Sequence, residues 1–161
     1  MKILHITAGS TNSGSFRGVY LLHKYLLTKG IQSRIINDSN EKKEKSLKKI
    51  KFLNKNFFSN LHLNLLHFFD RLPKAFFFFR KPTTFSTGLV GYDFTKLKEY
   101  YDADIIHLHW VNKGFFNIAD IDKINKPIVW TLRDMWAFTG GCHYSLECKK
   151  FISQCGNCPQ L

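Results

Sequence analysis

The first 37 residues carry two different hydrophobic periods. Residues 2–7 form a short apolar run, which indicates a strand, and residues 8–15 are rich in Gly and Ser, which is typical of a loop. Four hydrophobic residues then recur at helical spacing: Val19, Leu22, Tyr25 and Leu26. Gly30 marks the expected end of this helix, and residues 31–37 return to a strand pattern. This strand, loop, helix, strand unit is typical of the opening of a doubly wound α/β sheet.

The same alternation continues in the second half of the chain. Residues 105–110 and 127–132 are apolar enough for buried strands, and residues 94–101 and 115–124 favour helices. Residues 83–93 are interrupted by glycines and give no clear pattern. The predicted fold class is therefore α/β, with a Rossmann-like, doubly wound and mostly parallel sheet.

Ligands of such sheets bind beyond the carboxyl ends of the strands. The loops that follow the predicted strands cover residues 9–18, 109–114 and 133–141. We expect these three loops to converge on one crevice.

Length and composition predict a single domain over residues 1–161. At 161 residues and 44% hydrophobic content, the chain is long enough for a real core, which argues against disorder. No stretch reaches the roughly 18 uninterrupted apolar residues of a membrane span, and the chain starts directly in a strand pattern without a cleavable signal. These features predict a cytoplasmic protein.

Positive charge is concentrated in residues 41–81. The chain has a net charge of +12, and this window holds eleven basic and three acidic residues, together with nine phenylalanines. A basic, aromatic segment can bind an anionic membrane surface, or it can bind nucleic acid through phosphate contacts and stacking. A lysine-rich, solvated helix face over an ordinary core has the same composition.

A Cys-rich segment occupies residues 137–161. Its four cysteines are Cys142, Cys148, Cys155 and Cys158. The spacing C-x5-C-x6-C-x2-C can close around one tetrahedral zinc ion, and four thiolates would leave no open position for water, so we expect structural rather than catalytic zinc. Two alternatives stay open: cysteine pairs that oxidise only outside the cell, and reduced thiols that pack as small apolar groups.

Several loop residues are candidates for substrate contacts. Gly14 and Ser15 precede the first helix, where free backbone amides attract an anionic group, although a glycine loop here is often only a tight turn. His109 ends a predicted strand and is a candidate functional residue, the alternative being a core histidine. Arg133 and Asp134 follow the next strand, where they could hold a substrate hydroxyl or phosphate, or form a local ion pair.

Four stretches of the sequence together carry a family resemblance. Residues 103–112 read ADIIHLHWVN, and residues 126–161 contain WTLRDMWAFTGGCHYS. With residues 1–6 and residues 85–93, which read FSTGLVGYD, they resemble the family 4 glycosyltransferases of the GT-B fold, of the bacterial cell-surface polysaccharide type. The resemblance leaves out a basic, aromatic insert at residues 38–81, where this family varies.

The resemblance implies a two-part enzyme in which two Rossmann-like halves face a cleft. The first half binds the acceptor and the second binds the nucleotide sugar. This chain is similar to the first half only, so we expect the donor-binding domain, which would follow Leu161, to be absent and the chain alone to be inactive. The implied partners are a nucleotide sugar and a saccharide or lipid-linked acceptor, and no catalytic metal is expected.

The resemblance also implies roles for individual residues. Gly14 and Ser15 would lie near the donor diphosphate, and His109 would be the catalytic residue nearest the reacting sugar. The family often has histidine where this chain has Arg133, which changes the expected acceptor contacts.

The predicted function is transfer of a sugar to a cell-surface polysaccharide or lipid-linked acceptor, with peripheral attachment to the inner face of the membrane. The alternative is a small, basic, zinc-binding and nucleic-acid-binding protein. Charge and cysteines favour this alternative, whereas the α/β alternation disfavours it.

Overall fold

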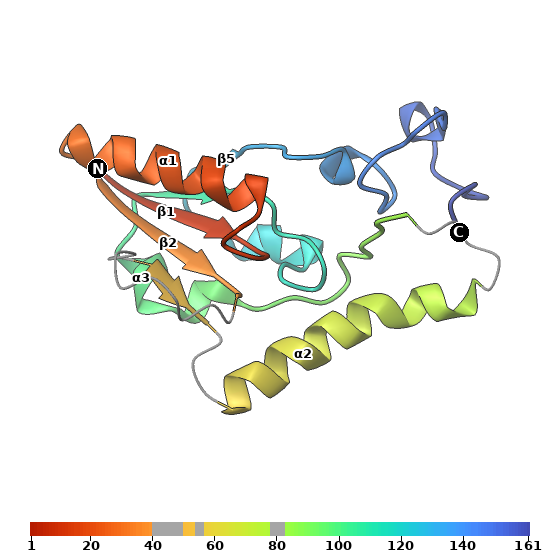
Figure 1. Ribbon diagram of the computed structural model, residues 1–161, viewed down its shortest axis with the longest axis horizontal. Coiled ribbons are helices and arrows are strands. Elements are labelled where there is room, and N and C mark those ends of the chain that lie inside the picture. The colour runs from red at the N-terminus through yellow and green to blue at the C-terminus, as the bar shows by residue number, and fades with distance from the viewer. Residues whose placement is uncertain (40–49, 54–56, 78–82) are drawn as a thin grey trace.

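A computed structural model describes residues 1–39, 50–53, 57–77 and 83–161 (Figure 1). Its centre is a parallel sheet of five strands in the order β3-β2-β1-β4-β5. The strands are β1 (Lys2–Thr7), β2 (Gln32–Asn37), β3 (Ile50–Phe52), β4 (Ile105–Leu108) and β5 (Ile128–Trp130). This order is that of a doubly wound sheet, and it confirms the predicted Rossmann-like α/β fold class.

Helix α1 (Gly14–Thr28) covers one face of the sheet (Figure 1). The Ser13 hydroxyl accepts a hydrogen bond of 3.2 Å from the Phe16 amide and so caps the first turn. Phe16 and Val19 pack against Ile35 of β2. Gly30, with a φ of +73°, follows the helix end, as the sequence predicts.

The larger core lies on the opposite face of the sheet. Short helical segments close this side: η2 (Phe94–Lys96), α3 (Lys98–Tyr101) and η3 (Ile118–Lys123). Their buried partners in the sheet are Leu4, Ile6, Ile36, Ile106 and Leu108. Side chains alternate between the two faces of a strand, and Ile35 on the opposite face packs against α1. Both faces of the sheet are therefore covered.

Two predicted helices differ from those observed. Residues 94–101 form η2 and α3, which meet at Leu97, instead of one helix. Residues 115–124 form only the 3₁₀ helix η3, because the backbone before it bonds to another loop: Tyr92 N donates to Phe115 O, and Ile118 N donates to Gly88 O. Gly91 lies so close to this backbone that an added Cβ would be 2.1 Å from Asn117 N.

Helix α2 (Phe57–Arg71) runs along one side of the molecule, away from the sheet (Figure 1), and continues into the 3₁₀ helix η1 (Leu72–Phe76). Leu63 is buried in the main core, and the Asp70 carboxylate accepts hydrogen bonds from the Thr87 amide and hydroxyl at 2.8 and 2.7 Å. The helix is thereby fixed to the loop that precedes η2. Much of the basic insert, at residues 40–49, 54–56 and 78–82, lies outside the described residues.

Two further 3₁₀ helices, η4 (Trp136–Phe138) and η5 (Lys150–Ile152), interrupt the segment after β5. None of the described helices is both long enough and apolar enough to cross a membrane.

Candidate functional site

A cavity of about 390 Å³ opens where strands β1 and β4 end. These strands are neighbours at the centre of the sheet, at the point where the strand order reverses. The lining residues come from three loops and one later segment: Ser13, Gly14, Ser15, Trp110, Arg133 and Tyr144. The predicted convergence of the three loops is confirmed, whereas Tyr144 was not foreseen from the sequence.

The loop after β1 is held tightly against the loop after β4. Ala8 N donates to Trp110 O at 2.7 Å. Gly9 follows with a φ of +89°, and an added Cβ would lie 3.1 Å from the Trp110 ring. A residue larger than glycine would therefore be strained at this position and would also meet the ring.

Positive electrostatic potential reaches the cavity from two sources. The amino terminus of α1 lies at Ser13 to Ser15, and its first turn carries no acidic residue. The Arg133 guanidinium lies against Gly18, one turn further along α1, where an added Cβ would be 2.8 Å from its Nη1 atom, and it lines the cavity as well. The candidate residues Gly14, Ser15 and Arg133 thus line one cavity that suits an anionic group.

His109 lies behind Arg133 and is only 1% exposed. Its Nδ1 atom is 3.4 Å from Arg133 Nη2, and its Nε2 atom is 3.0 Å from His5 Nδ1. Burial first, and then the charges of His107, His5 and Arg133, lower the pKa of His109 to about 2. The side chain is therefore neutral near pH 7. It can donate one hydrogen bond and accept another, but it carries no positive charge.

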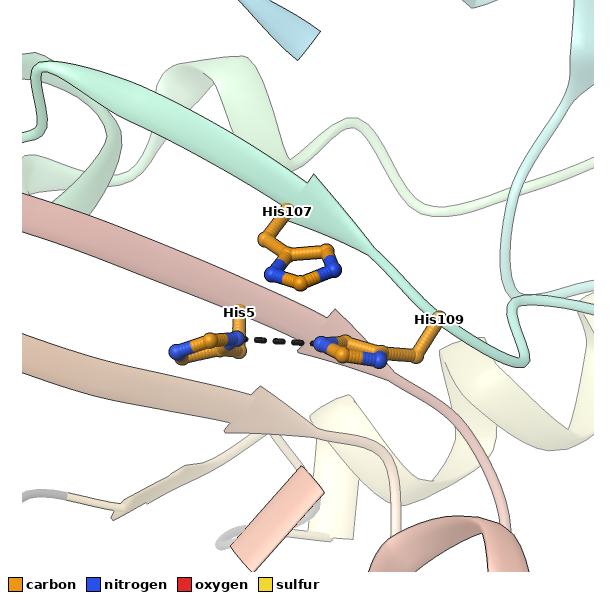
Figure 2. Close-up of side chains that lie close together, drawn as sticks. All are labelled: His5, His107 and His109. Carbon is orange, nitrogen blue, oxygen red and sulfur yellow. Dashed lines mark hydrogen bonds between the residues drawn. The ribbon is translucent and has the colours of Figure 1, made fainter. Parts of the chain in front are cut away.

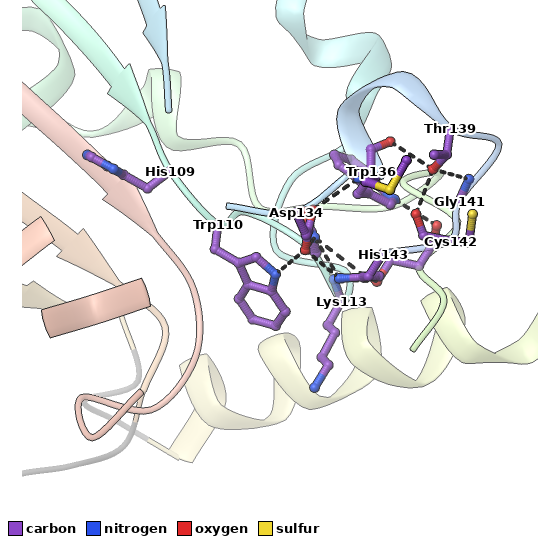
Figure 3. A network of polar contacts seen from close by, with 12 residues as sticks. His109, Trp110, Lys113, Asp134, Trp136, Thr139, Gly141, Cys142 and His143 are labelled. Carbon is purple, nitrogen blue, oxygen red and sulfur yellow. Dashed lines mark hydrogen bonds and ion pairs between the residues drawn. The ribbon is translucent and has the colours of Figure 1, made fainter. Parts of the chain in front are cut away.

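Asp134 is at the centre of a buried polar network (Figure 3). Trp110 Nε1 and His143 Nδ1 donate to its Oδ2 atom at 2.7 and 2.6 Å, and Trp136 N donates to Oδ1 at 3.0 Å. Burial alone would raise the pKa of this carboxyl, but the bonds from His143 and Trp136 outweigh it and lower the pKa. The basic partner that the structure gives Asp134 is His143, which is charged only if protonated, and the Asp134 carboxylate holds loops together beside the cavity.

The same network has the connectivity of a Ser-His-Asp triad. Ser86 Oγ is 3.0 Å from His143 Nε2, and His143 Nδ1 is 2.6 Å from the Asp134 carboxylate. Ser86 is fully buried, however, and its Oγ atom accepts a hydrogen bond from Lys113 N at 3.1 Å. A substrate carbonyl has no access to this hydroxyl, so the arrangement joins three loops instead of supplying a nucleophile.

The four cysteines line a second cavity, of about 560 Å³. Cys142 is buried, Cys148 and Cys158 are half-buried, and Cys155 is exposed. Burial raises the pKa of the Cys142 thiol, and the Cβ atom of Cys155 lies against Gly140. Zinc binding by this segment stays a prediction.

Besides the cysteines, the structure brings together a set of histidines that could bind a metal, which the sequence did not predict as a set. In the part of the chain that the structure describes, one ring nitrogen each of His5, His107 and His109 lies within 4.8 Å of the other two. The sequence does place His107 and His109 on one face, but the contribution of His5 depends on the strand pairing.

Comparison with known proteins gives one partial relationship. No protein-family model matches the chain, and no solved structure matches it. A stretch of 61 residues is 34% identical to the "Putative colanic acid biosynthesis glycosyl transferase WcaC" of Escherichia coli (strain K12). The match covers 35% of this chain and only 15% of that protein. This similarity supports a relationship to glycosyltransferases.

Proposed function

We propose that residues 1–161 form the acceptor-side domain of a glycosyltransferase, which takes part in moving a sugar from a nucleotide sugar to a saccharide or lipid-linked acceptor. The observation that carries the proposal is the cavity at the carboxyl ends of β1 and β4. It combines the amino terminus of α1, a guanidinium and two aromatic side chains. The partial identity to a glycosyltransferase supports the same reaction class.

The lining of the cavity suits a phosphorylated sugar. Amides at Gly14 and Ser15 and the Arg133 guanidinium can bind phosphate oxygens, whose negative charge grows as the donor bond breaks. Trp110 and Tyr144 offer apolar ring surfaces for the faces of a sugar, with Asp134 holding the Trp110 indole by its 2.7 Å bond. Arg133 lies between His109 and the cavity. The proposed contact of His109 with the reacting sugar therefore requires Arg133 to move aside.

The proposed function is tested by comparing ligands at equal salt concentration. The purified chain is titrated calorimetrically with a saccharide diphosphate, the unphosphorylated saccharide and a short single-stranded oligonucleotide. We expect the saccharide diphosphate to bind most tightly, because it presents a diphosphate to the α1 amides and Arg133 and a free saccharide ring to Trp110 and Tyr144. Tighter binding of the oligonucleotide would instead favour nucleic-acid recognition.

We also propose that helix α2 docks on an anionic membrane surface. Five large apolar residues of α2 are exposed, and at 100° per residue they fall within an arc of about 100°: Phe58, Leu61, Leu65, Phe68 and Phe69. Leu72, Phe76 and Phe77 extend the exposed apolar surface through η1 and just beyond it. The net charge of +8 over residues 41–81 selects an anionic lipid surface as the partner.

Replacing Phe58 and Phe68 with serine is expected to weaken vesicle binding at least tenfold, because burying one phenylalanine contributes about 1.5–3 kcal/mol. Sedimentation with vesicles that contain phosphatidylglycerol measures the effect, and vesicles of phosphatidylcholine alone are expected to bind less protein. Replacing the exposed Leu21 and Tyr25 of α1 with serine is the matched control. Equal loss of binding in both variants would contradict docking through α2.

We further propose that Cys142, Cys148, Cys155 and Cys158 bind one structural zinc ion. All four line a single cavity. Lys150 Nζ donates to Gly156 O and Asn157 O at 3.2 and 2.8 Å, which fixes the turn that carries the C-x2-C pair. A zinc ion here would tie this turn to the strand-like bridge between Phe85 and Cys142.

Protein purified without chelator is expected to show zinc–sulfur distances of about 2.3 Å by X-ray absorption. Replacing the exposed Cys155 with serine should remove most of this signal, whereas replacing the exposed Ser153 with alanine should leave it unchanged. Four thiols that titrate freely in native protein supplied with zinc would exclude the proposal.

A further inference from the structure

Three histidines gather on the face of the sheet that α1 covers (Figure 2). His5 of β1 is the register partner of His107 in β4, and both rings leave the same face because paired residues of neighbouring strands do so. His109 lies two residues after His107 and leaves that face as well. The sheet thus joins two segments of the chain that are 104 residues apart, counted from His5 to His109.

We infer that His5, His107 and His109 form a binding site for a divalent ion of the late first transition row, with Zn²⁺ as the best fit. Imidazole suits such ions, and three histidines with one open position form a familiar zinc donor set. Zinc–nitrogen bonds of 2.0–2.1 Å place tetrahedral ligand atoms about 3.4 Å apart. In the structure His5 Nδ1 is 3.0 Å from His109 Nε2, and one nitrogen of each ring lies within 4.8 Å of the others.

The three rings are in the protonation state that metals require. Only neutral imidazole coordinates a metal, and protons compete with the ion wherever the ring is basic. Burial, followed by neighbouring histidines, lowers the pKa of His5 to about 3, and burial also lowers the pKa of His107. Burial therefore favours the neutral form of these rings, which is the form that coordinates a metal.

The cluster also contains an unsatisfied polar atom. His5 Nε2 is buried, and the described residues supply it with no hydrogen-bond partner. Leaving such an atom unpaired is unfavourable. His5 Nδ1 faces His109 and Nε2 lies on the other side of the ring, so a bound ion would use Nδ1 unless the ring makes a half-turn that exchanges the two nitrogens (Figure 2).

Neighbouring side chains would orient the ligands and set the affinity. His107 Nε2 is 2.7 Å from Thr131 Oγ1, so coordination through Nδ1 would leave Nε2–H donating to that hydroxyl. Arg133 Nη2 lies 3.4 Å from His109 Nδ1 and opposes a nearby cation. Because Arg133 is half-exposed beside the cavity, it can turn outward, and its removal should strengthen metal binding.

The test uses the full chain and Zn²⁺ alone, measured against a chelating indicator. Replacing His107, the half-buried member, with glutamine is expected to weaken Zn²⁺ binding at this site at least tenfold, as is typical for changes at metal centres. His62→Gln, at an exposed position on α2, is the matched control and should bind as tightly as the parent. Arg133→Gln should bind more tightly. The cysteines are replaced with serine in a parallel set, so that only the histidine site is titrated.

X-ray absorption of the zinc-loaded parent chain gives an answer that does not depend on variants. A shell of nitrogen neighbours at 2.0–2.1 Å, distinct from sulfur at about 2.3 Å, is expected. Only sulfur or oxygen neighbours, or a His107→Gln protein that binds as tightly as the His62→Gln control, would overturn the inference. These readouts involve no sugar transfer, so they are independent of the proposed transferase function.

Discussion

Replacing Asp134 with alanine is expected to lower the free energy of unfolding by at least about 3 kcal/mol, because three donors lose their acceptor and each buried donor left unpaired costs about 1–3 kcal/mol. The substitution leaves the His143 ring and the Trp110 indole without the acceptor that they contact at 2.6 and 2.7 Å. It also removes the bond that caps the Trp136 amide at the start of η4. Urea denaturation followed by circular dichroism measures the loss.

The matched control for this prediction is Asp102→Ala. Asp102 is also an aspartate with a basic partner, Arg34, at 3.2 Å, but the Arg34 and Asp102 side chains are 48% and 40% exposed. Exposed ion pairs contribute about 0–1 kcal/mol, so the control should change stability little. If Asp134→Ala proved no more destabilising than Asp102→Ala, the network around Asp134 would not hold the cavity loops in place.

Replacing Arg133 with alanine is expected to weaken the binding of a saccharide diphosphate by about 10- to 100-fold, because a hydrogen bond to a charged group contributes about 1.5–3 kcal/mol. Arg133→Lys should recover part of the affinity, since it restores the charge but not the paired geometry of the guanidinium. Isothermal titration calorimetry at fixed ionic strength measures both.

Arg34→Ala is the control for Arg133→Ala. It removes the same charge from the chain, but Arg34 pairs with Asp102 and does not line the cavity. Affinity in this variant should stay close to that of the parent chain. A similar loss in both variants would mean that the ligand responds to overall charge instead of to the cavity.

Much of the fold follows from local sequence patterns. Strands β1, β2, β4 and β5 were predicted because apolar runs of strand length alternate with glycine-rich loops and helical spacing. Strand β3 was missed because three residues within a lysine-rich window are too few to establish a period. Residues 115–118 fit helical spacing, yet Phe115 O accepts from Tyr92 N and Ile118 N donates to Gly88 O. Tertiary contacts, not local spacing, determine these bonds.

The position of the candidate site was predictable, whereas its contacts were not. The doubly wound order places the carboxyl ends of β1, β4 and β5 at one edge of the sheet, and the loops after them bring Gly14, Trp110 and Arg133 to one cavity. The Ser86–His143 and His5–His109 contacts join residues 57 and 104 positions apart in sequence. Such contacts depend on strand register and loop packing, which hydrophobic spacing does not specify.

The most direct test of the acceptor-side domain is a map of where a saccharide diphosphate binds, obtained by nuclear magnetic resonance on the isotopically labelled chain. The largest shifts are expected at the amides of Gly14 and Ser15, the Trp110 indole and the Arg133 side chain. Shifts confined to the Cys-rich cavity or to α2, or no saturable shifts in the cavity at the carboxyl ends of β1 and β4, would contradict the proposal.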